Sequence, residues 1–211
     1  MDRAEETRKF VEKVEVLNSR FTLPYKQKGA SRICTFNVHQ LRSPLPIDFS
    51  GKDTTVMVGN MLRNLEVDIV LLQECPSNFL SDVFPFHDYD PDTQLAVGSW
   101  YQLTKLHAST YLINDFILTN VHFDVRDPFT AFRRMSSIFQ QYKEQRYFVA
   151  GDCNSSEAVQ WFAPYNLNRC FVGLTCWAGT EVDFIFTNGP VHKSFVAPVT
   201  LSDHLPVVYD V

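Results

Sequence analysis

Short apolar runs that end in polar residues recur along this chain of 211 residues. The run at 147–150 is bounded by a glycine and leads directly into Asp152 and Asn154, a pattern typical of a buried strand. A polar turn would use the same two residue types for their turn geometry. Other strand-like runs, at 33–38, 67–72 and 115–121, also end beside Asn, Glu or His. Since strand ends of layered α/β folds hold side chains in a crevice, this recurrence favours a functional site.

The remaining pattern predicts helices between these strands. Apolar residues recur at helical spacing in 2–19, 52–65, 129–145 and 156–162. Several β-rich pieces between 94 and 121 predict an antiparallel meander, and further strands are expected at 181–187 and 205–211. Strands grouped with intervening helices predict an α/β fold, a four-layer sandwich of two packed mixed β-sheets flanked by helices.

Composition supports a globular protein and limits its partners. Hydrophobic residues make up 45% of the chain and charged residues 20%, which is enough for one buried core. The formal net charge of -5 gives no global attraction to polyanions, so a nucleic-acid substrate would need a local basic patch or a bound cation. The five cysteines show no Cys-x-x-Cys spacing, and no apolar run reaches membrane-span length. We therefore expect an intracellular protein, in the cytoplasm or the nucleus, without a signal peptide.

Several polar residues have both a structural and a functional interpretation. Glu74 follows an apolar strand and is either a solvated strand end or a cation ligand. Asp183 lies within an apolar run, so a buried carboxylate there requires a partner, for which a histidine is the natural choice. Asp203 and His204 are adjacent before the last strand, and Asn37 could donate to a phosphate or cap a turn.

Six short motifs appear in one order between residues 35 and 206, and each contains one or more of these polar residues. The motifs are Thr35-Phe36-Asn37-Val38, Leu72-Gln73-Glu74, Thr119-Asn120-Val121-His122, Gly151-Asp152-Cys153-Asn154-Ser155, Val182-Asp183-Phe184-Ile185-Phe186 and Ser202-Asp203-His204-Leu205-Pro206. In this order they resemble the motif series of the endonuclease/exonuclease/phosphatase superfamily, Mg-dependent hydrolases with a pancreatic-type deoxyribonuclease fold. The resemblance implies an endonuclease/exonuclease/phosphatase domain at 29–211, preceded by an amphipathic helix and linker at 1–28.

The resemblance also implies a role for each residue. Glu74 and Asp203 would bind Mg²⁺, with Mn²⁺ as the expected substitute, because hard oxygen donors suit these ions. Asp152 would activate the attacking water, and His204, oriented by Asp183, would donate to the phosphate. The remaining expected site residues contact the phosphate, the leaving group or a base: Asn37, Asn154, His122 and Trp177. For Trp177, a core position is the equal alternative.

The residues and the resemblance leave three functional hypotheses. The leading hypothesis is a Mg-dependent phosphodiesterase that hydrolyses phosphodiester bonds in nucleic acid, as a nuclease or a DNA-end-processing enzyme. The first alternative is a phosphatase acting on phosphoinositides or other small phosphorylated molecules, which the acidic net charge fits at least as well. A non-catalytic binding domain is the second alternative, and it predicts loss of an acid or a histidine from the motifs. None is lost.

Overall fold

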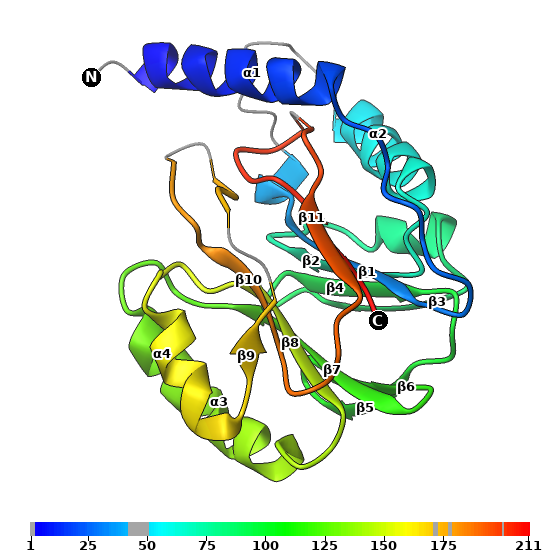
Figure 1. Ribbon diagram of the computed structural model, residues 1–211, viewed down its shortest axis with the longest axis vertical. Helices are drawn as coiled ribbons and strands as arrows, with labels where there is room; N and C mark the ends of the chain where they lie inside the picture. The colour runs from blue at the N-terminus through cyan, green and yellow to red at the C-terminus, as the bar shows by residue number, and fades with distance from the viewer. Residues whose placement is uncertain (1–2, 42–50, 171–172, 177–178, 200) are drawn as a thin grey trace.

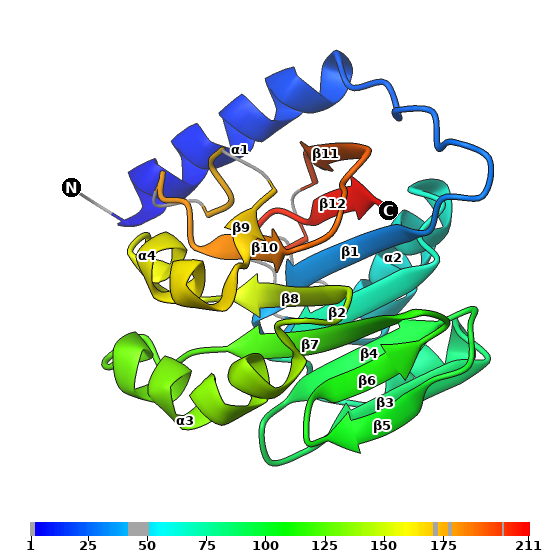
Figure 2. The same ribbon diagram turned by 60° about the horizontal axis from the view of Figure 1, so that its bottom comes forward.

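The computed structural model describes residues 3–41, 51–170, 173–176, 179–199 and 201–211. Two six-stranded mixed sheets pack face to face. One helix (Gly51–Asn64) lies on the outer side of the first sheet, two helices (Pro128–Tyr142 and Ala158–Phe162) lie on the outer side of the second, and a fourth (Arg3–Ser19) crosses one edge of the sandwich (Figures 1 and 2). The four-layer α/β sandwich predicted from the sequence is therefore confirmed. No helix in the described part of the chain is long and apolar enough to cross a membrane.

The first sheet has the order β11-β12-β1-β2-β4-β3. Its strands are β1 (Arg32–Asn37), β2 (Ile69–Gln73), β3 (Phe86–Asp90), β4 (Leu95–Ser99), β11 (Lys193–Val196) and β12 (Val207–Asp210). Helices α1 (Arg3–Ser19) and α2 (Gly51–Asn64) accompany it, together with the 3-10 turns His39–Leu41 and Phe79–Asp82. β1 and β2 are parallel, because the crossover through α2 returns the chain in the same direction.

The second sheet has the order β5-β6-β7-β8-β10-β9. Its strands are β5 (Thr104–His107), β6 (Thr110–Ile113), β7 (Phe116–His122), β8 (Tyr147–Asp152), β9 (Asn168–Arg169) and β10 (Asp183–Thr187). Its outer face is covered by α3 (Pro128–Tyr142) and α4 (Ala158–Phe162), the latter followed by a 3-10 turn at Ala163–Tyr165. Asp127 caps α3 by accepting the Thr130 N–H, and Pro128 occupies the first turn.

Two of the expected elements differ from the structure. The predicted meander at 94–121 divides between the sheets, since β4 pairs with β2 and β3 whereas β5, β6 and β7 form the meander. Local alternation of apolar residues predicts strands but does not specify which sheet each one joins. Asp183 is the first residue of β10 and not an interior position, because the strand begins two residues later than the apolar pattern. The short strands β9 and β11 carry too few apolar residues to be predicted.

The apolar residues form three successive layers. Side chains of α2 pack on the outer face of β1 and β2, and side chains of α3 and α4 pack on the outer face of β7, β8 and β10. Between the sheets lies a third cluster that includes Ile33, Leu71, Leu118, Phe148 and Tyr209. A fully buried set of this kind holds the two sheets rigidly against each other and fixes the positions of their strand ends.

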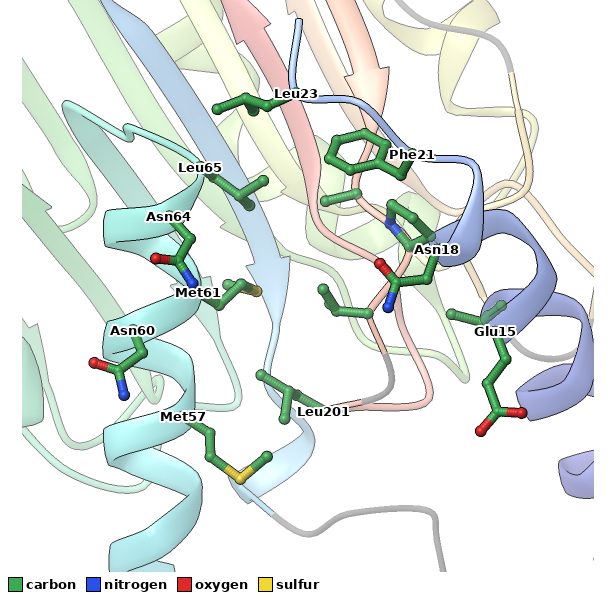
Figure 3. A pocket seen from close by; sticks show the side chains of 14 residues that line it. Glu15, Asn18, Phe21, Leu23, Met57, Asn60, Met61, Asn64, Leu65 and Leu201 are labelled. Atoms are coloured by element: carbon green, nitrogen blue, oxygen red, sulfur yellow. The ribbon is translucent and has the colours of Figure 1, made fainter.

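Helix α1 crosses the edge of the sandwich near β11, and a groove lies between it and α2 (Figure 3). Val14 is buried with Leu205, while Asn18, Met57 and Leu201 line the groove, whose volume is about 490 Å³. The expected polar site residues are not among its lining residues. The division of the chain at residue 28 stays a prediction.

Candidate active site

Strand register brings the predicted polar residues to one end of the sandwich. In the first sheet Asn37 is the register partner of Gln73, so Glu74 follows directly at the same edge. In the second sheet His122 is aligned with Asp152 on the parallel strand β8, and Asp183 opposes Asp152 from the antiparallel strand β10. Residues separated by more than a hundred positions in the chain therefore meet at one site.

Gly151 allows the two parallel strands to approach at this edge. Its φ is +149°, and a Cβ atom at this position would clash with the carbonyl oxygen of Val121 on β7. A glycine has no Cβ, so it permits both the backbone conformation and the close approach. The placement of Asp152 beside His122 depends on this one residue.

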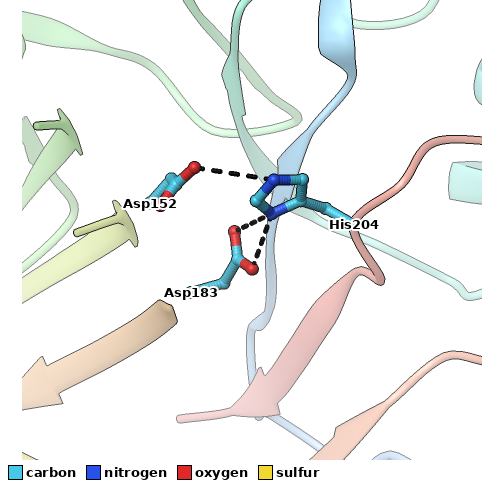
Figure 4. Close-up of side chains that lie close together, drawn as sticks. All are labelled: Asp152, Asp183 and His204. Atoms are coloured by element: carbon cyan, nitrogen blue, oxygen red, sulfur yellow. Dashed lines mark hydrogen bonds and ion pairs between the residues drawn. The ribbon is translucent and has the colours of Figure 1, made fainter. Parts of the chain in front are cut away.

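Asp152, Asp183 and His204 form a compact buried group (Figure 4). His204 Nδ1 lies 2.8 Å from Asp183 Oδ2 and 3.1 Å from Oδ1, while its Nε2 lies 3.7 Å from Asp152 Oδ2. One ligand atom from each residue lies within 4.8 Å of the others, so the group could hold a metal ion. Because Nδ1 contacts both oxygens of Asp183, this nitrogen is expected to carry a proton that it donates to the carboxylate, and an Nδ1 that donates in this way does not bind a metal ion.

Burial and charge set the protonation of this group. Burial alone lowers the pKa of His204, but the Asp183 carboxylate, through its charge and its hydrogen bond, raises that pKa well above the usual value. Burial raises the pKa of Asp152 to about 7, and the charge of Asp183 adds to this effect while His204 opposes it. A cationic imidazole thus faces a carboxylate that can accept a proton near neutral pH.

Thr175 fixes the distance between Asp183 and His204. Its hydroxyl oxygen accepts the backbone N–H of Asp183 at 3.1 Å, and its carbonyl accepts the N–H of Leu205 at 2.7 Å. Ser202 anchors the same loop from the other side by donating its hydroxyl to the carbonyl of Asn37 at 2.7 Å. Ser202 belongs to the last of the six motifs, but its anchoring role, like that of Thr175, has no distinctive sequence pattern and was not predicted.

Asn37 connects the two halves of the site. Its side-chain Nδ2 donates to Glu74 Oε1 and to Asp152 Oδ2, both at 3.0 Å, and its Oδ1 accepts the His39 N–H at 2.9 Å. A single amide therefore orients the predicted metal ligand and the predicted general base. In this structure it contacts carboxylates, so its predicted contact with a phosphate stays a prediction.

Glu74 and Asp203 supply oxygen donors at the more accessible side of the site. Their side chains are 25% and 13% exposed, whereas Asp152 and Asp183 are each 1% exposed. Carboxylate oxygens that still reach solvent suit a hard divalent cation, which keeps several water ligands. The donor chemistry therefore fits the Mg²⁺ or Mn²⁺ that the motif series implies, and the assignment of Glu74 and Asp203 as the ligands of the ion stays a prediction.

Two histidines lie beside Glu74. His122 Nε2 is 3.7 Å from Glu74 Oε1, and burial lowers the pKa of His122, although the Glu74 charge opposes this shift. His39 Nδ1 is 3.8 Å from Glu74 Oε2 and 3.5 Å from Asp203 Oδ1. The sequence analysis did not include His39 among the site residues. Its position two residues after Asn37, at a strand end, is the signal that could have identified it.

Asn154 supports Asp152 from the adjacent loop. Its backbone N–H donates to Asp152 Oδ1 at 2.8 Å, and its Nδ2 donates to the carbonyl of Phe123 at 2.8 Å. The predicted phosphate contact of Asn154 stays a prediction. Trp177, expected to contact a base, lies outside the described residues.

No family model matches the sequence, and no curated protein matches it. Among solved structures, an endonuclease/exonuclease/phosphatase from Beutenbergia cavernae is similar to this protein, with a TM-score of 0.68 and a sequence identity of 16%. The aligned region covers 86% of this chain and 71% of the Beutenbergia chain. The human Nocturnin catalytic domain has a TM-score of 0.64 and a sequence identity of 16%, and the aligned region covers 87% of this chain and 93% of that domain.

A third similar structure is the endonuclease domain of TRAS1, a telomere-specific non-LTR retrotransposon. Its TM-score is 0.61 at 13% identity, with 86% of this chain and 98% of that domain covered. At identities this low the likeness establishes the fold. The protein has the endonuclease/exonuclease/phosphatase fold, as the order of its six motifs predicts.

Proposed function

We propose that this protein is a divalent-cation-dependent phosphoric ester hydrolase that cleaves phosphodiester bonds in nucleic acid. The observation that carries the proposal is the convergence of Asp152, the Asp183–His204 pair and the Asn37–Glu74 pair, which are joined by hydrogen bonds and by the ion-pair contact between His204 and Asp152. A carboxylate base, a cationic imidazole and an oxygen-donor cation site are the three components that phosphate ester hydrolysis requires.

Asp152 is proposed as the general base. Its pKa of about 7 allows it to accept a proton from water at neutral pH, and hydrogen bonds from Asn37 and Asn154 hold its two oxygens in place. A base held in this way aligns the water with the phosphorus and lowers the entropic cost of attack.

His204 is proposed to bind the phosphate. Because Asp183 engages Nδ1, Nε2 is the ring nitrogen left on the side of Asp152, and a cationic Nε2–H can donate to a phosphate oxygen that binds beside the two residues. Charge that develops on the phosphate is then stabilised by a donor whose position is already fixed. When bound at Glu74 and Asp203, the cation would add positive charge beside the same phosphate.

The remaining predicted residues complete the proposal. The neutral imidazole that burial favours for His122 would assist the leaving group or bind phosphate. Asn37 and Asn154 would contact phosphate oxygens, and Trp177 would stack on a base.

Nucleic acid is proposed as the substrate because the TRAS1 domain, whose fold this chain shares, is by its description an endonuclease. The net charge of -5 favours the second candidate, a phosphatase for phosphoinositides or other small phosphorylated molecules, since a long polyanion would be repelled. An intracellular location is part of the proposal, in line with Cys34, Cys75, Cys153 and Cys170, which form no disulfide bond in the structure.

A substrate panel with Mg²⁺, and again with a chelator, tests the proposal. Single- and double-stranded DNA, RNA, a tyrosyl-linked oligonucleotide and inositol phosphates are incubated with the wild type and with Asp152→Asn. Cation-dependent cleavage of a nucleic acid by the wild type alone supports the leading function. Release of phosphate from inositol phosphates alone supports the second candidate, and no turnover of any substrate contradicts both.

A further inference from the structure

Helix α1 contributes one side chain, Val14, to the buried interior. Among the residues of α1 whose burial the structure describes, Val14 alone is buried, at 2% exposed, whereas Val16 and Leu17 are 53% and 48% exposed. Val14 packs against Leu205, which is 4% exposed, and against Val196 at the end of β11. The helix therefore contacts the sandwich where the chain passes from β11 to β12, directly beneath α1 in Figure 1.

The residue that Val14 covers is the neighbour of a site residue. Leu205 follows His204, whose ring contacts Asp183 inside the site, while the Leu205 side chain packs outward against α1. His204 lies in an isolated β-bridge, and on such extended backbone adjacent side chains point to opposite sides. The Leu205 N–H donates to the Thr175 carbonyl at 2.7 Å, and the Thr175 hydroxyl accepts the Asp183 N–H at 3.1 Å. The contact with α1 therefore stabilises the backbone that fixes the distance between His204 and Asp183.

The segment after α1 keeps the helix close to this contact. Phe21 packs against Phe195 of β11, with ring centroids 5.9 Å apart. The Pro24 carbonyl accepts a hydrogen bond from the buried Arg32 side chain at 2.8 Å. Because Phe21 and Val14 are separated by only about two helical turns, little chain entropy is lost when the helix docks.

We propose that Val14 is a positioning residue of the hydrolytic site, which acts through Leu205 to hold His204 at its distance from Asp183. The N-terminal helix is then a part of the site and not an independent extension. The effect on turnover rests on the function proposed above. The inference goes beyond that function because it gives a role to a residue that lies outside the six motifs.

Hydrogen exchange at the Leu205 N–H, measured by NMR on the full chain, tests the placement without turnover. This amide is bonded to the Thr175 carbonyl, so its exchange rate reports how firmly the segment is held. In Val14→Ala the exchange at Leu205 should become about tenfold faster or more, while amides of the central strand β8 change by less than about twofold. Exchange that became faster at both places would indicate a general loss of stability.

Two further variants serve as controls. Val16→Ala is the same substitution in the same helix at an exposed position, so it changes helix propensity equally and should leave exchange at Leu205 unchanged. Val14→Ile retains a β-branched apolar side chain and should preserve the wild-type exchange rate.

Turnover of bis(4-nitrophenyl) phosphate with Mg²⁺ is measured for the same four proteins, under conditions where urea denaturation shows each to be folded. Val14→Ala should lower kcat about tenfold and change KM less than about twofold, because a misplaced His204 weakens interactions made in the transition state. Val16→Ala and Val14→Ile should keep kcat within about twofold of the wild type. A purely structural contribution of Val14 would leave kcat unchanged in every folded variant.

The contradicting results separate the two proposals. Unchanged exchange at Leu205 in Val14→Ala, an equal increase in β8, or faster exchange with a normal kcat overturns the positioning role and leaves the proposed function standing. If the wild type hydrolyses no phosphate ester, the proposed function fails. Faster exchange confined to Leu205 in Val14→Ala would then still support the link between α1 and the backbone of His204.

Discussion

His204 Nδ1 lies 2.8 Å from Asp183 Oδ2, although Asp183 begins β10 of the second sheet and His204 lies 21 positions later, in the loop before β12 of the first sheet. The carboxylate raises the pKa of His204 well above its usual value against the opposing effect of burial. Asp183→Asn removes the charge while keeping the shape of the side chain, so the imidazole should become neutral at pH 7. We expect kcat to fall about 100-fold or more with a smaller change in KM.

The His204 ring nitrogens report the protonation state directly in ¹⁵N spectra. In the wild type both nitrogens should be protonated at neutral pH, and in Asp183→Asn one should lose its proton. A variant that keeps a doubly protonated ring and a normal kcat would show that Asp183 does not act through His204.

Asp152 should reduce the stability of the cation-free protein. Its pKa is about 7 in the folded state against an ordinary value near 3.8, so between these pH values the folded state binds more protons than the unfolded state. The free energy of unfolding must then fall as pH rises from about 4 to 7. Asp152→Asn lacks this contribution, and with chelator present it should be more stable than the wild type at pH 7 and nearly equal at pH 4.

Urea denaturation at both pH values measures this difference, and the same variant should be inactive. If the wild type and Asp152→Asn had the same free energy of unfolding at pH 7, burial of the ionised Asp152 carboxylate would not destabilise the protein, which would contradict this prediction.

Gly151 should tolerate no side chain. In Gly151→Ala the new methyl group meets the Val121 carbonyl, and relief of the clash would separate β7 from β8 at the site. We expect a loss of about 3–5 kcal/mol in the free energy of unfolding, typical of a severe backbone clash. Gly29→Ala is the matched control, since Gly29 also has a positive φ of 86° but no atom within 4 Å of an added Cβ, and it should cost only about 1 kcal/mol.

Asn120 should be essential for packing of the two sheets. Its Oδ1 accepts from Gln73 Nε2 at 2.7 Å, and its Nδ2 donates to the carbonyls of Leu72 and Ala96 on the opposite sheet. Asn120→Ala removes three buried hydrogen bonds between the sheets, which should lower the free energy of unfolding by about 2–4 kcal/mol. Asn64→Ala, at an exposed position on α2, should change it by less than about 0.5 kcal/mol. Equal effects of the two substitutions in urea denaturation would contradict this role.

The sequence predicted the layers of the fold because each sheet face has its own apolar set. Residues such as Val70 and Leu71 alternate between the outer and inner clusters, so a strand that is buried on both faces has the continuous apolar run seen in the sequence. The sequence could not show that β4 belongs to the first sheet. That choice depends on pairing with β2, a contact between distant residues that no local pattern records.

The sequence predicted the residues of the candidate site that lie within the six motifs. The residues named from them, including Glu74, Asp152 and His204, do meet in the structure. His39 and Thr175 were missed because their positions depend on backbone conformation, a left-handed turn for one and a bridging hydroxyl for the other. Such features arise only from the assembled fold.

A structure of the wild type with Mn²⁺ and inorganic phosphate tests the central claim most directly. The account predicts anomalous density for one ion bound to Glu74, with the phosphate in contact with His204 Nε2 and within hydrogen-bond reach of a water held by Asp152. Phosphate bound elsewhere on the protein, with no ion at Glu74, would contradict it.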